Sequence, residues 1–173
     1  MNQAADVINL TIPAKPEFVS VVRLASSGIA NRMGYNFDDI EDIKVAISEA
    51  CTNVVSHAYK NHNMGKINIK IECTDCSLII TVIDHGDSFD IEDAVKKMKP
   101  LDPSKSLNQV GEGGLGLFLI DSLMDEVTIC NDSGGIVKMI KFLNRDGVER
   151  RADKVSQTTD RTAKTHFSLS KES

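Results

Sequence analysis

Three polar residues recur at intervals of four in the stretch SEACTNVVSHAY, residues 48–59: Glu49, Asn53 and His57. On an α-helix this spacing puts them in one row, rotated about 40 to 120° from an apolar stripe. That stripe consists of Ile43, Ile47, Ala50, Val54 and Ala58. The row therefore borders the face that the helix is expected to bury, and does not lie on the opposite, solvated face.

The carboxylate and the amide of this row suit nucleotide chemistry. Asn53 offers a neutral oxygen to Mg²⁺, which keeps most of its waters and needs few protein ligands. Glu49, one turn earlier, would then face the outer end of a triphosphate and accept a proton from an attacking hydroxyl or water. Polar residues in such a row also commonly cap a sheet edge or bond a neighbouring loop, so the row alone leaves both interpretations open.

A second polar group, DHGD at residues 84–87, follows the apolar run LIITVI. An aspartate at the end of such a strand accepts a hydrogen bond from an exocyclic amino group such as that of adenine. Gly86 has no Cβ and would let a flat ring approach the backbone. Asp and Gly are equally typical of an ordinary turn.

The stretch GEGGLGLFLI, residues 111–120, places four glycines just before and at the start of an expected helix. A loop of this kind exposes backbone N–H groups, and the positive end of the helix dipole adds to their attraction for a phosphate chain. It is not a Walker loop, and the dinucleotide G-x-G-x-x-G spacing is absent. A flexible hinge that leads into a helix is the alternative.

Hydrophobic periodicity and turn residues indicate the elements that must position these groups. We expect a strand that ends at Pro13, and a helix from Pro16 that ends before Gly34. Asp38 and Glu41 resemble a capping box at the start of a long helix to about Tyr59. The remaining expectations are a hairpin of strands 66–73 and 77–84, a short helix over 91–98, a lid over 99–113, a buried helix over 115–124, and strands over 126–130 and 135–143.

This order of elements favours an α+β fold, a two-layer sandwich of a mixed sheet with helices on one face. The 173 residues, 41% of them hydrophobic, suit one domain over 1–143 and a polar, flexible tail over 144–173. The tail holds seven Lys/Arg and five Asp/Glu and is therefore positively charged. Because the net charge of the whole chain is −5, the remaining chain carries about −7. That balance argues against nucleic acid as a direct partner.

Cysteine usage and the N-terminus both indicate a cytoplasmic protein. Four cysteines do not make a disulfide scaffold in a chain of this size. Cys73 and Cys76 form a C-x-x-C, which elsewhere is half a zinc site or a redox pair, but no second pair completes four ligands, so we expect a structural role. Neither a signal peptide nor an apolar run long enough to span a membrane is found, and no membrane partner is expected.

Taken together, these stretches resemble a known superfamily. EACTNVVSHAY, DHGDSFD and GGLGLFLI look like the N, G1 and G2 boxes of the GHKL (Bergerat) ATPases, which include the histidine kinases. Residues 6–143, with EDIKVAISEACTN and SLMDEV, are more similar to the sigma-regulating branch of that superfamily. This branch comprises the anti-sigma serine kinases of the bacterial general stress response and of sporulation.

The resemblance implies a two-layer ATP-binding kinase domain with ATP and Mg²⁺ as cofactors. It implies phosphorylation of a serine on an anti-anti-sigma protein, sequestration of an alternative sigma factor, and a homodimer. Glu49 would be the general base and Asn53 the magnesium ligand. The implied nucleotide-binding residues are Asn53, Asp84, Gly86, Lys105, Gly113, Gly114, Leu115 and Gly116, with Lys105 near the γ-phosphate, while His57 would be structural.

Three positions depart from the pattern of the superfamily. Ser88 replaces a frequent second glycine of the G1 box. Glu112 stands where some relatives have a basic residue. Ile136 stands where a threonine hydroxyl often supports the adenine site. The alternative to a kinase is a nucleotide-gated binding module without phosphotransfer, and replacement of Glu49 by Gln distinguishes the two.

Overall fold

The computed structural model describes residues 6–58, 65–85, 112–131 and 134–144. All helices and strands described here belong to one unit, Met1–Leu143, and Asn144–Ser173 forms the other. None of the described helices is both long and apolar enough to cross a membrane. The expected short helix over 91–98, and most of the expected lid, lie outside the described residues.

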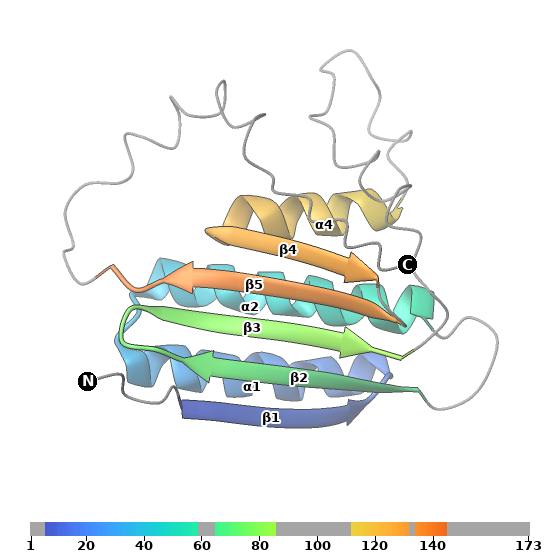
Figure 1. Cartoon of the computed structure of the whole chain (residues 1–173), viewed down its shortest axis with the longest axis horizontal. Coiled ribbons are helices and arrows are strands. Elements are labelled where there is room, and N and C mark those ends of the chain that lie inside the picture. Colours follow the sequence, from blue (N-terminus) through green and yellow to red (C-terminus); the bar gives the residue numbers. More distant parts are fainter. Residues whose placement is uncertain (1–5, 59–64, 86–111, 132–133, 145–173) are drawn as a thin grey trace, which may run out of the picture. The chain divides into compact units, whose positions relative to one another are not determined.

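Five strands form one sheet in the order β1-β2-β3-β5-β4 (Figure 1). The strands are β1 Asp6–Pro13, β2 Lys66–Cys73, β3 Ser77–Asp84, β4 Glu126–Asn131 and β5 Gly135–Phe142. The helices are α1 Pro16–Met33, α2 Phe37–Asn53 and α4 Glu112–Leu123, and a π-helical segment, η1 Val54–Ala58, continues α2. The π-helical segment covers most of the expected end of the long helix.

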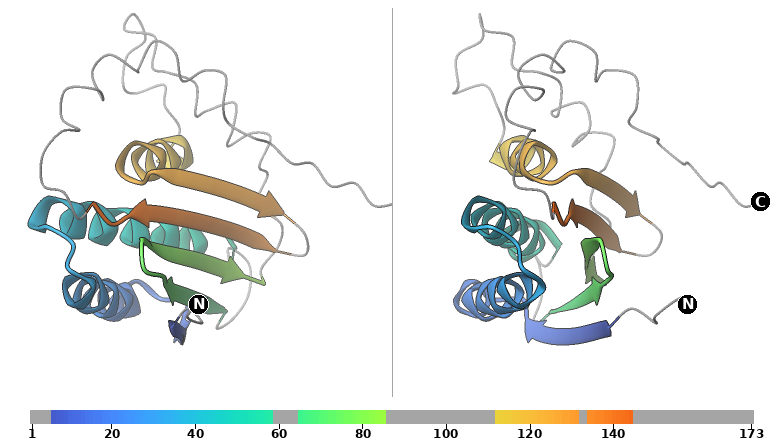
Figure 2. Two further views of the ribbon diagram at one scale, coloured as in Figure 1. Left: turned by 60° about the vertical axis from the view of Figure 1, so that its left-hand side comes forward. Right: turned by 90° about the vertical axis from the view of Figure 1, so that its left-hand side faces the viewer.

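The three α-helices cover one face of the sheet, as Figure 2 shows when the layers are viewed along their edge. This confirms the expected α+β sandwich. The sheet itself differs from the expected mixed one, because all four described strand pairings are antiparallel. Two successive helices, α1 and α2, lie between β1 and β2, and an even number of helical passages returns the chain to the end where β1 stopped. The next strand must therefore run in the opposite direction.

The ends of α1 follow local sequence as predicted. Pro16 occupies the start of the helix, where a missing N–H costs nothing. Gly34 ends it in the left-handed region, at φ 91°, and its N–H donates to the carbonyls of Ala30 and Asn31. Glycine adopts this conformation without the steric cost that a Cβ would add.

The start of α2 corrects the expected capping box. Asn36, not Asp38, is the N-cap: its backbone is extended, and its Oδ1 accepts a hydrogen bond of 2.8 Å from Asp39 N–H. Asp38 lies in the first turn of the helix, where a carboxylate interacts favourably with the positive end of the helix dipole. Asn and Asp are both good caps, so composition alone did not separate the two positions.

The core forms where α2 packs against the sheet. Ile43, Ile47 and Ala50 are at most 1% exposed. They meet the alternating inward residues of the central strands, which are Ile67, Ile69 and Ile71 of β2 and Leu78, Ile80 and Val82 of β3. Each such isoleucine or leucine contributes about 1.5 to 3 kcal/mol by leaving water. This packing fixes the rotation of α2 about its axis, and with it the direction of the polar row.

Helix α4 differs from the fully buried helix that its sequence predicted. It begins at Glu112, and Leu115 and Phe118 are 45% and 39% exposed. Leu117 and Ile120 are buried. The reason is its position on the outside of the helical layer, where one face of α4 meets the other described elements.

The buried thiol of Cys51 gives a test of this packing. Burial raises the pKa of Cys51 to about 12, so the thiol stays protonated at pH 8 and is a poor nucleophile. Cys76 is exposed. We expect iodoacetamide at pH 8 to alkylate Cys76 but not Cys51 in the native protein, and both in urea, as read by peptide mass spectrometry. Equal labelling of the two thiols in the native protein would contradict the described core.

Candidate functional site

The polar row of α2 faces the first turns of α4. A Cβ added to Gly116 would lie 3.0 Å from Glu49 Oε2 and 3.2 Å from Asn53 Oδ1. The structure thus brings together Glu49, Asn53 and Gly116, three residues that the sequence analysis selected from two separate motifs. A side chain at position 116 would crowd both polar groups, so glycine favours this close approach.

Asn53 carries an unsatisfied polar group at this contact. Its Nδ2 is buried and has no hydrogen-bond partner among the described residues. Leaving a buried donor unpaired costs about 1 to 3 kcal/mol. A cost of this size indicates a polar partner other than the described residues. The amide thus suits a polar ligand, and its oxygen is a ligand of the kind that Mg²⁺ accepts.

The beginning of α4 adds backbone donors beside these side chains. The first four N–H groups of an α-helix have no acceptor within the helix, and the dipole places partial positive charge there. In α4 these are the N–H groups of residues 112–115, which include Gly113, Gly114 and Leu115. This end of the helix therefore favours an anion next to Glu49 and Asn53.

Asp84 lies at the other side of the candidate site, at the end of β3. Its side chain is 5% exposed. Gly134 and Gly135, at the start of β5, press against it: a Cβ on Gly134 would collide with the Asp84 carbonyl oxygen, and one on Gly135 with Asp84 Oδ2. Gly134 also has a backbone φ of 138°, a conformation that residues with a side chain rarely adopt. From the sequence, Gly134 was expected between two strands and Gly135 at the start of the second, with no role in the site, although a Gly-Gly pair entering a strand was the available signal.

The strand register also corrects the expectation for Ile136. Ile136 pairs with Ile83. Neighbouring residues of a strand point to opposite faces of the sheet, so Ile136 lies on the face away from Asp84. Gly135 is the residue that adjoins the aspartate, and its lack of a side chain lets the Asp84 carboxylate lie close to the backbone of β5.

A series of polar contacts on the helix-free face of the sheet holds His85, the residue next to Asp84. His85 Nε2 is 3.1 Å from Asn68 Nδ2, and Asn68 Oδ1 accepts a hydrogen bond of 2.9 Å from the hydroxyl of Thr11. Three strands thus contribute to the position at which the chain leaves β3. The sequence analysis did not identify Asn68 or Thr11, because their contacts span up to 57 residues.

Figure 1 shows that β3 ends, α2 ends and α4 begins at the same side of the layers. The aspartate, the polar row and the helix N-terminus therefore share one end of the domain. Gly86, Ser88 and Lys105 lie outside the described residues. For His57 only the backbone, within η1, is described. Cys73 and Cys76 are free thiols, and the described residues contain no group of three or more His, Cys, Asp or Glu that could hold a metal ion.

Comparison with known families gives this fold and site a class. The model of the histidine kinase-like ATPase domain matches residues 12–141. The match spans β1 to β5 and includes Glu49, Asn53, Asp84 and Gly116. The chain belongs to the family of histidine kinase-like ATPase domains.

Curated relatives narrow this class. The chain is 52% identical over 150 residues to the serine-protein kinase RsbW of Bacillus licheniformis, which covers 86% of this chain and 93% of the relative. It is 47% identical over 149 residues to RsbW of Bacillus subtilis strain 168, with the same coverage. It is 46% identical over 156 residues to RsbW of Staphylococcus aureus strain MSSA476, covering 90% and 98%. Within its family, the chain is an RsbW-like serine-protein kinase.

A solved structure has the same fold. The RsbU and RsbW domains of Rv1364c from Mycobacterium tuberculosis match with a TM-score of 0.59 and 22% identity. The match covers 82% of this chain and 33% of that one. At this identity the likeness concerns the fold alone.

Gly116 offers a test of the contact between α2 and α4. Gly116→Ala should favour the helix by about 1 kcal/mol yet reduce affinity for ATP, because its Cβ would crowd Glu49 and Asn53. Gly28→Ala is the matched control, since a Cβ at Gly28 of α1 meets nothing within 4 Å. Calorimetric titration with ATP and thermal unfolding measure the two effects. Unchanged ATP affinity in Gly116→Ala would contradict the proximity of Gly116 to the site.

Proposed function

We propose that this kinase uses ATP and Mg²⁺ to phosphorylate a serine on an anti-anti-sigma protein. We also propose that it acts as an anti-sigma factor by sequestering an alternative sigma factor. The observation that carries the catalytic proposal is the convergence of Glu49 and Asn53 on the first turns of α4, with Asn53 Nδ2 buried and unpaired among the described residues.

In this proposal the phosphate chain lies between α2 and the start of α4. Backbone N–H groups of residues 112–115 hold its oxygens, and Asn53 Oδ1 is the ligand for Mg²⁺, which neutralises charge on the phosphates. Lys105, outside the described residues, is our candidate for further charge compensation near the γ-phosphate. The resulting arrangement orients the terminal phosphorus toward the acceptor serine.

Glu49 is the proposed general base. The serine hydroxyl oxygen forms a bond to the γ-phosphorus as the bond from that phosphorus to the β–γ bridging oxygen breaks, and ADP leaves. The hydroxyl proton passes to the carboxylate of Glu49. Its position one turn before Asn53 on the same helix places the base next to the metal ligand, so the rigidity of α2 sets their separation.

The adenine end is the proposed role of the β3 and β5 termini. Asp84 would accept a hydrogen bond from the adenine amino group. Gly86 would leave room for the ring at the backbone, and Gly134 and Gly135 would let Asp84 pack close to the start of β5. Nucleotide state would bias the choice between the two protein partners, since ATP and ADP differ only at the phosphate end of this site.

We further propose a homodimer as the working form of the kinase. The exposed apolar side chains of the first strand and helix, Val7, Val21 and Leu24, are 46%, 50% and 69% exposed. Val21 and Leu24 lie one turn apart on α1, where exposed apolar side chains favour association with another protein surface. Sedimentation equilibrium of the purified chain measures the stoichiometry directly.

The test of the catalytic proposal is Glu49→Gln. This variant keeps the size and polarity of residue 49 but removes the base, so phosphotransfer from γ-labelled ATP to a cognate anti-anti-sigma protein should fall by roughly 100-fold or more. Affinity for ATP should change by less than about threefold, because the amide still packs against Gly116. The label should also be absent from an acceptor that lacks its serine.

Two outcomes would overturn parts of this proposal. Full phosphotransfer by Glu49→Gln would remove Glu49 from the role of base. Tight, magnesium-dependent ATP binding without any phosphotransfer by the wild type would instead favour the nucleotide-gated binding module, in which partner release does not depend on Glu49.

A further inference from the structure

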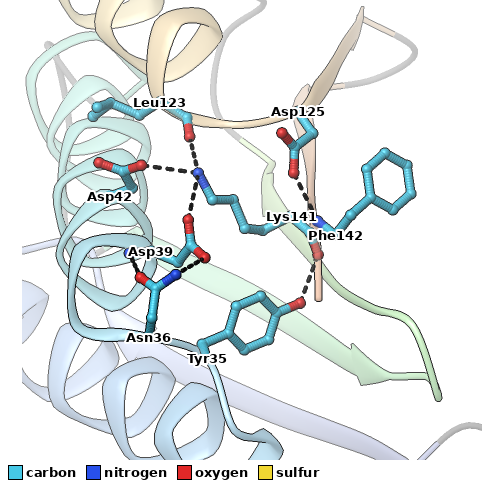
Figure 3. A network of polar contacts seen from close by, with 8 residues as sticks. All are labelled: Tyr35, Asn36, Asp39, Asp42, Leu123, Asp125, Lys141 and Phe142. Carbon is cyan, nitrogen blue, oxygen red and sulfur yellow. Dashed lines mark hydrogen bonds and ion pairs between the residues drawn. The ribbon is translucent and has the colours of Figure 1, made fainter. Parts of the chain in front are cut away.

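A buried lysine near the end of β5 links the start of α2 to the end of α4. Lys141 of β5 has a side chain only 2% exposed. Its Nζ lies 2.9 Å from Asp42 Oδ2, 3.5 Å from Asp39 Oδ1 and 2.6 Å from the carbonyl oxygen of Leu123 (Figure 3). Asp39 and Asp42 belong to α2, and Leu123 is the last residue of α4.

The groups around Lys141 are themselves held in place. Asn36 Nδ2 donates to Asp39 Oδ2 over 2.8 Å, and Tyr35 donates its hydroxyl to the Lys141 carbonyl over 2.6 Å. Asp125 Oδ2 accepts from the N–H of Phe142 over 2.7 Å. Figure 3 shows the ammonium group between the two helices, with Tyr35 and Asp125 on the strand side of it.

The lysine ammonium group donates hydrogen bonds to Asp42 Oδ2 and to the Leu123 carbonyl oxygen, and it forms an ion pair with Asp39. Apolar packing is non-directional and tolerates small sliding movements of one helix along another. Two hydrogen bonds and an ion pair from one nitrogen to two helices instead favour one axial register. Lys141 therefore specifies where along α2 the end of α4 lies.

The site lies at the opposite ends of the same two helices. Along α2, Asp42 and Asn53 are separated by eleven residues, or about 16 Å of helix. On α4, Leu123 is at the end of the helix, whereas Gly116 lies near its start and touches Glu49 and Asn53. The helices are antiparallel, so a shift of α4 at Leu123 moves Gly116 along α2 by a similar distance.

We infer that Lys141 is a positioning residue for the phosphotransfer step: it fixes the axial register of α4 on α2 and so holds Gly116 against Glu49 and Asn53. The kinetic part of this inference rests on the proposed function. Lys141 touches neither Glu49 nor Asn53, and it acts through the two helices. Asp84 and its glycines lie on β3 and β5, so the adenine end does not depend on this register.

The test compares three variants. Lys141→Met leaves Asp39 and Asp42 without their buried partner and should lower the melting temperature. In the triple variant Lys141→Met, Asp39→Asn, Asp42→Asn, the uncompensated charges are gone, and the melting temperature should recover. Lys138→Met changes an exposed lysine of the same strand and is the matched control.

We expect the triple variant to keep ADP affinity within about threefold of the wild type while its kcat for serine phosphorylation stays roughly 10- to 100-fold lower, the effect of a displacement on the order of 1 Å. The Lys138→Met control should match the wild type in both. Recovery of kcat together with melting temperature would overturn the inference, because Lys141 would then act through stability alone.

A second readout does not depend on catalysis. The Gly116 Cβ position lies 3.3 Å from Asn53 Nδ2, so the wild type should give an NMR Overhauser contact between the Gly116 α protons and the Asn53 side-chain amide. The triple variant should lose that contact. Its persistence at full strength would overturn the role of Lys141, whereas absence of phosphotransfer by the wild type would count against the proposed function only.

Discussion

The burial of one stripe of α2 against the central strands is the constraint on which the rest of this domain depends. Ile43, Ile47 and Ala50 are almost completely excluded from water. With the stripe in the core, the neighbouring row that carries Glu49 and Asn53 must lie at the border of the core, where α4 closes over it. The same hydrophobic contact therefore stabilises the fold and orients the polar groups.

The two ends of the candidate site are built by different means. At the helical end, a close approach at Gly116 brings a helix N-terminus to a carboxylate and an amide. At the sheet end, two glycines at the start of β5 let a buried aspartate pack close against the backbone. In the proposed function, this division would separate recognition of the base from positioning of the phosphates. ATP and ADP share the first feature and differ in the second.

Much of this was accessible from sequence because it is local. The periodicity of residues 43–58 gave the stripe and the polar row, Pro16 and Gly34 delimited α1, and alternation gave the β2–β3 hairpin. The cap was missed because Asn36 and Asp38 are both residues that cap well. The proximity of Gly135 to Asp84 in place of Ile136 and the 99-residue separation of Lys141 from Asp42 follow instead from strand register and packing. Local patterns carry no information about either.

The most direct measurement is a crystal structure of the protein with Mg²⁺ and a non-hydrolysable ATP analogue. Our account predicts Asn53 Oδ1 at about 2.1 Å from the metal ion, the carboxylate of Glu49 beside the γ-phosphate, and the adenine amino group on Asp84. A nucleotide bound away from α2, or a magnesium ion held without Asn53, would contradict it.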